Sequence, residues 1–320
     1  MRAESSPNSF RTESIYLRHH LIKGIRGFFY DNGYLEVDTP ILVRCPGIDP
    51  YIDAVKADKD KYLATSPELL MKRLLGILSY PMSGGREVKE SNPAIKIFQI
   101  THGFRSAEIG NYHNPEFTIL EWYQSQANYE DIMDETENLI KKMDEVIAHH
   151  TQRNLLFDLA FPRFSVDEVF AKYAGWKPSE KWEEDRFFLN LIELVEPALA
   201  NLPAFFLYDF PAQLASLARL KPENLRVSER FEMYIKGVEI ANAFTELVSY
   251  PEQEARFKRD LSKRQSQGKE VYPIDHRFLD TLKEGLPPCA GIALGVDRLL
   301  MTLCERNSLG QIMPFTVDRL

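Results

Sequence analysis

The sequence is poor in cysteine, has no long apolar run and opens on a polar segment. Its three cysteines, Cys45, Cys289 and Cys304, lie far apart without the paired spacing of a zinc site, which predicts structural thiols in a reducing compartment. No run of about 18 apolar residues, the length of a spanning helix, is present. We therefore expect no zinc site, no membrane insertion and no secretion, and a cytoplasmic location.

Positive charge is also in short supply. Lys and Arg number 39 against 47 Asp and Glu, a formal net charge of -8 at pH 7. Such a chain lacks the broad basic surface with which proteins bind nucleic-acid phosphates, so only a local basic patch could serve that purpose. At 320 residues and 44% hydrophobic content it can bury a sizeable core, without an internal repeat or a clear linker. The expectation is one domain over residues 1–320 and no stable tRNA binding.

Hydrophobic periodicity and chain punctuation predict the order of elements. Helices are predicted over residues 12–32, 129–150, 166–176 and 251–268. Another starts in TSPELLMKRLLGIL, where Ser66 is a candidate N-cap followed by Pro67. Strands are predicted over residues 95–104, 116–123 and 205–210 and from residue 289, with an exposed loop over 81–93. Because strands and helices do not alternate regularly, the predicted fold class is α+β.

The strand EFTILEWY, residues 116–123, carries an unusual face. Side chains alternate with period two along a strand, so Glu121 and Tyr123 share a face with Phe117 and Ile119. One interpretation is an edge strand with a solvent-facing glutamate. The other is a strand that presents a ring, a carboxylate and a phenol to a site.

Two further glutamates are brought together by a predicted hairpin. Lys236 and Gly237 suit a two-residue turn that pairs Tyr234 with Glu239 and places Glu232 on the same face. Like charges about 4 Å apart cost about 4 kcal/mol at an effective dielectric near 20, so a cation between them is one interpretation. Oxygen ligands favour Mg²⁺. Two separate, solvated glutamates are the alternative.

Beyond this turn, Asn242, Phe244 and Glu246 alternate on one face but have the opposite parity to Glu239. All four can line one pocket only if an extra residue interrupts the pairing. Bulges of this kind often lie beside active sites. We therefore predict a β-bulge near residues 240–241.

The segment CAGIALGVDRLLMTL has small residues at Ala290, Gly291, Ala293 and Gly295, ahead of a helix that contains Arg298. A flat strand lets a planar ligand lie close to the backbone, and an arginine at its end can reach a phosphate. Tight packing of small residues against a helix is the alternative interpretation.

Taken together, these segments resemble the three motifs of class II aminoacyl-tRNA synthetases. The first is a helix followed by GYLEVDTP, which ends at Pro40; the second is FRSAE with HNPEF; the third is GIALGVDR. Within that superfamily, TSPELLMKRLL, residues 113–123 and EIANAFTEL resemble the lysyl branch. The resemblance implies the class II catalytic fold, an antiparallel sheet flanked by helices, and a homodimer with the first helix and GYLEVDTPIL at its interface.

The resemblance also implies roles for single residues. Arg105 and Arg298 would be the catalytic residues that hold ATP phosphates. ATP would be bound by Arg105, Glu108, His113, Phe117, Glu239 and Arg298, and Mg²⁺ by Glu232 and Glu239. The amino acid would be surrounded by Glu68, Glu121, Tyr123, Asn242, Phe244, Glu246 and Ala293. Three glutamates complement the two ammonium groups of a diamino acid, and Phe244 offers apolar surface to its methylene stem.

Three departures from lysyl-tRNA synthetase are informative. Only about a dozen residues precede the first helix, so we expect no anticodon-binding domain. Ala293 replaces the glycine of the third motif, and FPAQLASLA stands where the synthetases have YPxExSPLA. These features are similar to the elongation factor P (EF-P)–lysine ligases, truncated paralogues that join (R)-β-lysine to a lysine side chain of EF-P. The alternatives are a lysine-activating enzyme that loads tRNA or another carrier, and a catalytically silent regulatory paralogue.

One departure bears on the second motif. Its usual pattern is F-R-x-E, whereas Ala107 occupies the glutamate position here and Glu108 follows it. Either the loop shifts so that Glu108 serves, or one contact to the nucleotide or amino acid is lost. The expectation for Arg105 does not depend on which holds.

Overall fold

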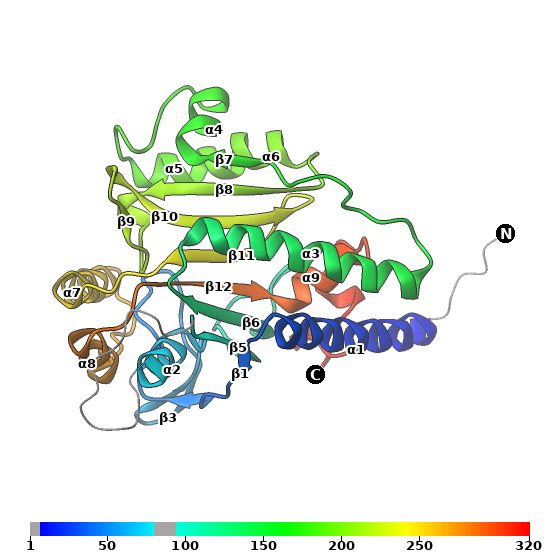
Figure 1. The fold of residues 1–320 in the computed structure, drawn as a ribbon, viewed down its shortest axis with the longest axis horizontal. Coiled ribbons are helices and arrows are strands. Elements are labelled where there is room, and N and C mark those ends of the chain that lie inside the picture. Colours follow the sequence, from blue (N-terminus) through cyan, green and yellow to red (C-terminus); the bar gives the residue numbers. More distant parts are fainter. Residues whose placement is uncertain (1–6, 80–93) are drawn as a thin grey trace.

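The structure, a computed structural model, describes residues 7–79 and 94–320. The loop predicted over residues 81–93 lies outside the described residues. Within them, one broad sheet carries helices on both faces, beside a small three-stranded sheet (Figure 1). The predicted α+β class, an antiparallel sheet flanked by helices, is confirmed.

The main sheet is built from strands distributed over the whole described chain. Its strands are β1 Leu35–Glu36, β5 Lys96–Phe104, β6 Glu116–Ser125, β7 Arg163–Ser165, β8 Ala204–Pro211, β9 Leu220–Lys221, β10 Asn224–Ile235, β11 Val238–Thr245 and β12 Cys289–Gly295. They lie in the order β1-β5-β6-β12-β11-β10-β8-β7, with β9 beside β10. The long central strands pair antiparallel, whereas the short outer strands β1 and β7 run parallel to their neighbours. The small sheet contains β2 Leu42–Val43, β3 Lys56–Asp58 and β4 Lys61–Leu63.

Helices cover the two faces of the main sheet unequally. They are α1 Pro7–Asp31, α2 Glu68–Ser79, α3 Tyr129–Thr151, α4 Val166–Tyr173, α5 Glu184–Asn190, α6 Glu196–Leu199, α7 Tyr250–Ser266, α8 His276–Glu284 and α9 Val296–Leu303. In Figure 1, α1 and α3 lie side by side, and their buried residues pack on one face of the sheet. Buried residues of α2, α7 and α8, and separately of α4 and α5, pack on the other face. That second face carries the site.

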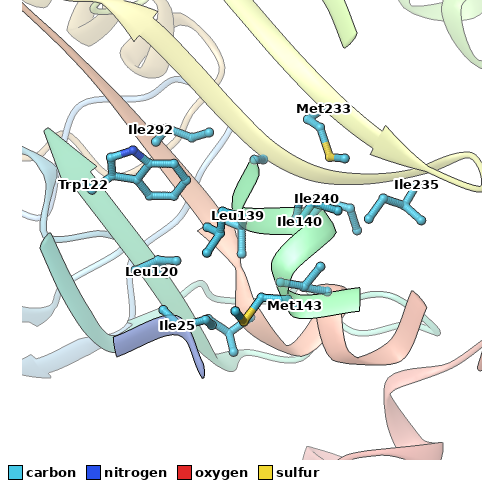
Figure 2. Packing of buried hydrophobic residues seen from close by; sticks show 14 of the residues in the cluster. Ile25, Leu120, Trp122, Leu139, Ile140, Met143, Met233, Ile235, Ile240 and Ile292 are labelled. Atoms are coloured by element: carbon cyan, nitrogen blue, oxygen red, sulfur yellow. The ribbon is translucent and has the colours of Figure 1, made fainter. Parts of the chain in front are cut away.

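Helix α3 explains why the face of the sheet under α1 and α3 is apolar and buried. The Asn128 side chain accepts hydrogen bonds from the N–H groups of Glu130 and Asp131, and the Asp131 side chain accepts from the Asn128 N–H, which together form a capping box. Its apolar stripe then packs against α1 and the central strands, as Figure 2 shows for Ile25, Leu120, Trp122, Leu139, Ile140, Met143, Met233, Ile240 and Ile292. Because side chains alternate along each strand, the polar side chains of these strands lie on the opposite face of the sheet.

The predicted helix bounds differ from the structure by three residues or more at two ends. Helix α1 begins at Pro7 rather than at residue 12, because a proline suits the first turn of a helix. Helix α4 ends at Tyr173 rather than at residue 176. Gly175 has φ +76°, a left-handed conformation that helix interiors do not contain.

The predicted hairpin and bulge are both present. Tyr234 pairs with Glu239 across a turn in which Lys236 has φ 50° and Gly237 has φ 76°, as a type I′ turn requires. The register then shifts, because Met233 pairs with Ala241 and leaves Ile240 as the extra residue. This bulge brings Glu239 to the same face of the sheet as Asn242 and Phe244.

Candidate active site

The floor of the site is a grid of side chains across three neighbouring strands. One row crosses Tyr123 of β6, Gly291 of β12 and Phe244 of β11. The next row crosses Glu121, Ala293 and Asn242 in the same strand order. The interpretation of β6 as an edge strand is wrong, because it lies between β5 and β12 and Glu121 is only 1% exposed.

A single cavity of about 690 Å³ opens above this grid, a size within the range of small-molecule sites. Every residue predicted to bind ATP, metal or amino acid lines it: Glu68, Arg105, Glu108, His113, Phe117, Glu121, Tyr123, Glu232, Glu239, Asn242, Phe244, Glu246, Ala293 and Arg298. Residues more than two hundred positions apart in the chain therefore meet in one place. Their individual roles stay predictions.

The cavity has two chemically different ends, which are separated along β12. At Gly291 an added Cβ would lie 2.9 Å from Oε1 of Glu246, whereas at Gly295 it would lie 3.7 Å from Cδ of Arg298. Four residues of extended strand separate the two glycines by about 13 Å. We call the part around Glu246, Glu121 and Glu68 the carboxylate end, and the part around Arg105 and Arg298 the arginine end.

At the arginine end, one arginine packs on an aromatic ring and the other is held by backbone carbonyl oxygens. The guanidinium of Arg105 lies 5.0 Å from the ring centroid of Phe117, and its Nε is buried without a hydrogen-bond partner among the described residues. Arg298 donates from Nε to the Tyr112 carbonyl oxygen and from Nη1 to the Glu239 carbonyl oxygen, both at 3.0 Å. Each arginine retains donor groups for an anionic ligand.

His113 lies among these charges. Burial lowers its pKa below the ordinary value, and the positive charge of Arg298 lowers it further, against opposing contributions from Glu108 and Glu239. The positive charge of Arg105 also lowers the pKa of His113. The imidazole is therefore neutral at pH 7 and can offer both a donor and an acceptor nitrogen.

Glu108 follows an unusual backbone turn. Ala107 is exposed and has φ 64°, an uncommon conformation for a residue other than glycine. Glu108 lines the cavity, with Oε1 3.9 Å from Nη1 of Arg105. The turn at Ala107 thus directs Glu108, one position later than the usual pattern, toward the arginine end.

Glu232 and Glu239 lie on one face and interact. Burial raises the pKa of Glu232 to about 7, and the Glu239 charge adds to the effect, although Arg230 opposes it. Nη2 of Arg230 and the hydroxyl of Tyr234 each donate to the Glu232 carboxylate at 2.7 Å. The interpretation of two separate, solvated glutamates is wrong, because Glu232 is only 8% exposed.

The donor set at this pair fits Mg²⁺. No group of three or more acidic, histidine or cysteine ligands occurs within residues 7–79 and 94–320, so the pair offers two carboxylates at most. Magnesium commonly takes one or two carboxylates and completes its octahedron with substrate phosphates and water. Glu232 and Glu239 could hold the ion on those terms.

The carboxylate end contains acceptors without donors. Oε1 of Glu121 and Oε1 of Glu246 have no hydrogen-bond partner in the described part of the chain, and both side chains are almost wholly buried. Burial raises the pKa of Glu121 well above its usual range and that of Glu246 to about 8. A buried acceptor left unsatisfied is costly, so this end favours a ligand that brings N–H donors and positive charge.

Sequence reasoning missed several residues of the cavity. Lys72 of α2 is 2% exposed and pairs with Glu68 at 2.7 Å and with Glu246 at 2.5 Å. Its spacing of four residues from Glu68 was the available signal. Arg230 donates to Asn242 at 3.1 Å as well as to Glu232. It lies two positions before Glu232 on β10, so the two side chains share a face of that strand. Gln253 of α7 lines the cavity with no hydrogen-bond partner for its amide among the described residues, and no sequence signal marked it.

Comparison with known proteins agrees with this geometry. The profile of the family "tRNA synthetases class II (D, K and N)" matches residues 5–319. The chain belongs to this family. Among its relatives are elongation factor P–(R)-beta-lysine ligases from Hamiltonella defensa, 38% identical, and from Erwinia tasmaniensis and Salmonella arizonae, each 37% identical. Each match covers 94% of both chains, which confirms the resemblance seen in the sequence.

No described helix combines the length and the apolar character that a bilayer crossing needs. The match to a synthetase family, together with the cavity, indicates an ATP-using ligase. The class II family typically uses Mg²⁺ with ATP, which agrees with the donor set at Glu232 and Glu239.

Proposed function

We propose that the chain activates (R)-β-lysine, or lysine, with ATP and transfers it to a lysine side chain of elongation factor P. One observation carries the proposal: a cavity with two arginines at one end and three glutamates at the other. The relatives at 37 to 38% identity carry the same activity in their names. An AMP-forming ligase needs both ends, one for the triphosphate and one for a diamino acid.

The reaction has two steps. A carboxylate oxygen of the amino acid attacks the α-phosphorus of ATP. The bond between this phosphorus and the oxygen that bridges the α- and β-phosphates breaks, and pyrophosphate leaves with that oxygen. The ε-amine of the acceptor lysine then attacks the acyl carbon of the adenylate, loses a proton and expels AMP, which leaves an amide. No protein nucleophile is required, so positioning and charge stabilisation supply the acceleration.

Arg105 and Arg298 are assigned to the phosphates. Their guanidinium groups would donate to oxygens whose negative charge grows in the transition state. Phe117 would stack on adenine, and His113 and Glu108 would contact the nucleotide beside it. Mg²⁺ held by Glu232 and Glu239 would neutralise phosphate charge when bound.

The amino acid is assigned to the carboxylate end. Its distal ammonium would donate to the unpartnered oxygens of Glu121 and Glu246, beside the hydroxyl of Tyr123. Phe244 would contact the methylene stem and Asn242 the middle of the substrate. The acid group would then point along β12 toward the arginine end, where ATP is attacked.

Two assembly proposals accompany the reaction. Large apolar side chains remain exposed on and after α1, namely Ile15, Tyr16, Tyr30, Leu35 and Leu42, which supports a homodimer through this surface. The proposed acceptor is a protein rather than tRNA, as the names of the relatives suggest, and at a net charge of -8 any docking patch for it must be local. Both fit the EF-P ligase assignment.

The decisive experiment is a pair of assays on the purified protein. We expect ATP–pyrophosphate exchange with lysine or (R)-β-lysine and none with aspartate, whose second carboxylate would face the glutamates. We also expect labelled amino acid to transfer to EF-P and not to tRNA. Transfer to tRNA alone would favour the tRNA-loading enzyme, and absence of exchange with every amino acid would favour a silent paralogue.

Replacing Ala293 with glycine tests the discrimination between the two lysines. Its methyl group stands on the cavity face between Glu121 and Asn242, where it would crowd an amino group on Cα but not one on Cβ. We expect Ala293→Gly to raise kcat/KM for lysine relative to (R)-β-lysine by roughly 10-fold or more. Ala290→Gly, on the opposite face of β12, is the matched control. An unchanged preference in Ala293→Gly would defeat the steric argument.

A further inference from the structure

The least expected feature of the cavity is a buried ammonium group at its carboxylate end. Lys72 is 2% exposed, and its Nζ donates to Oε1 of Glu68 at 2.7 Å. The same Nζ lies 2.5 Å from Oε2 of Glu246, a close ion pair without directional hydrogen-bond geometry. One lysine thus joins two of the three glutamates, from α2 across to the residue after β11.

This arrangement divides the oxygens of Glu246. Oε2 is occupied by Lys72, whereas Oε1 faces Gly291 and has no hydrogen-bond partner among the described residues. The carboxylate is therefore fixed by one charge and left open on its other oxygen. A substrate ammonium at this end meets Oε1 of Glu246 and Oε1 of Glu121, not the oxygens that Lys72 holds.

We propose that Lys72 is a positioning residue of the ligase, which fixes Glu68 and Glu246 so that the free oxygen of Glu246 faces the distal ammonium of the diamino acid. The inference rests on the proposed function for the identity of the ligand. It assigns to Lys72 no contact with the substrate. The residue acts through the two carboxylates that it pairs with.

The electrostatics of the pair supports this role. Burial alone would lower the pKa of Lys72, but the charges of Glu246 and Glu68 raise it above its ordinary value, so the ammonium stays protonated. Burial raises the pKa of Glu246, and Lys72 opposes that rise while Glu68 adds to it. Among the described residues, the titratable groups that face Glu246 are Glu68, Lys72, Glu121, Tyr123 and Cys289. Lys72 is the one cation in this set.

Removal of the cation should therefore act on amino acid binding and on its pH dependence. In Lys72→Met, Glu246 loses its counter-ion and its pKa rises further. Each unit by which that pKa exceeds the assay pH lowers the ionised fraction tenfold, so we expect the KM for the amino acid at pH 7 to rise by at least ~10-fold. The KM for ATP should stay unchanged, because the arginine end is not altered.

The sign of the pH effect is fixed. Glu246 binds the ammonium as a carboxylate, so kcat/KM for the amino acid rises as pH increases through the pKa of Glu246. In Lys72→Met this rise moves to higher pH, and in Lys72→Arg, which keeps the charge, it stays near the wild-type position. The double variant Lys72→Met with Glu68→Gln removes a like charge beside Glu246 and should move the rise partly back.

A readout without substrate separates this inference from the proposed function. Infrared titration of the protein alone follows the band of protonated buried carboxyl groups, whose midpoint should be higher in Lys72→Met than in the wild type. Lys141→Met is the matched control, because Lys141 pairs with Glu137 at the same four-residue spacing on α3, away from the cavity. It should change neither the midpoint nor either KM.

Three results would overturn the inference. They are an unchanged carboxyl midpoint in Lys72→Met, an equal rise in both KM values, or a pH profile of Lys72→Arg displaced as far as that of Lys72→Met. If Lys72→Met does not fold, the Arg variant and the double variant carry the same comparison. Absence of exchange in the wild type would count against the proposed function, while the infrared midpoint still decides the role of Lys72.

Discussion

Arg105→Ala should lower the rate of ATP–pyrophosphate exchange by about 10²–10³-fold, equivalent to the ~2.7–4 kcal/mol that a donor at developing negative charge contributes. The reason lies in its position. Its guanidinium lines the cavity over Phe117, and its buried Nε has no hydrogen-bond partner among the described residues, which supports the proposed contact with a phosphate. The loss should appear in kcat/KM for ATP and leave amino acid binding, measured by calorimetry, intact.

The matched control is Arg163→Ala. Arg163 also lies over an aromatic ring, 5.5 Å from the centroid of Phe206, and pairs with Asp134, but it does not line the cavity. Arg105→Lys keeps the charge without the planar fork and should fall between the wild type and Arg105→Ala. Exchange by Arg105→Ala within about threefold of the Arg163→Ala rate would remove Arg105 from the phosphate site.

Local chemistry explains which parts of the site were predictable. Strand parity needs only the period of two, so it placed Glu121 and Tyr123 on one face without knowledge of any partner strand. The turn at Lys236 and Gly237 likewise fixes its own register. Opposite parity before and after residue 240 then required the bulge that the structure contains. Each inference spans only a few residues.

What failed depended on contacts between distant segments. Whether β6 was an edge or a central strand was decided by its pairing with β12, more than 160 residues later, which parity cannot show. Lys72 was not predicted, because Glu246 reaches it only after β11 is placed in the sheet. The glutamates of the carboxylate end were thus predictable from the sequence, but the cation among them, Lys72, was not.

The family resemblance filled this gap for the predicted site residues and not for the others. The site residues that it indicated all line the cavity. It gave no information on Arg230, which donates hydrogen bonds to Asn242 and Glu232. Arg230 is required by physical chemistry, since the buried carboxylate of Glu232 must be paired or protonated.

Gly291→Ala should remove amino acid activation while it leaves ATP binding nearly unchanged. An added Cβ would lie 2.2 Å from Cε1 of Tyr123 and 2.9 Å from Oε1 of Glu246, distances at which atoms must move. Tyr123 is 3% exposed and packs among buried residues of α2 and α8, so its ring has little room to shift. The strain typically costs ~1–3 kcal/mol of stability.

The functional loss should exceed that cost, because the shift displaces Glu246, which would receive the distal ammonium, and Tyr123 beside it. We expect the KM for lysine or (R)-β-lysine to rise by at least ~100-fold, the equivalent of ~2.7 kcal/mol. Gly27→Ala is the control, because an added Cβ there meets no atom within 4 Å and alanine favours the helix. Thermal unfolding and calorimetry with ATP check that Gly291→Ala is folded and binds nucleotide. A folded Gly291→Ala with the KM of the Gly27→Ala control would show that the amino acid does not lie over Gly291, and the carboxylate end would lose its assigned ligand.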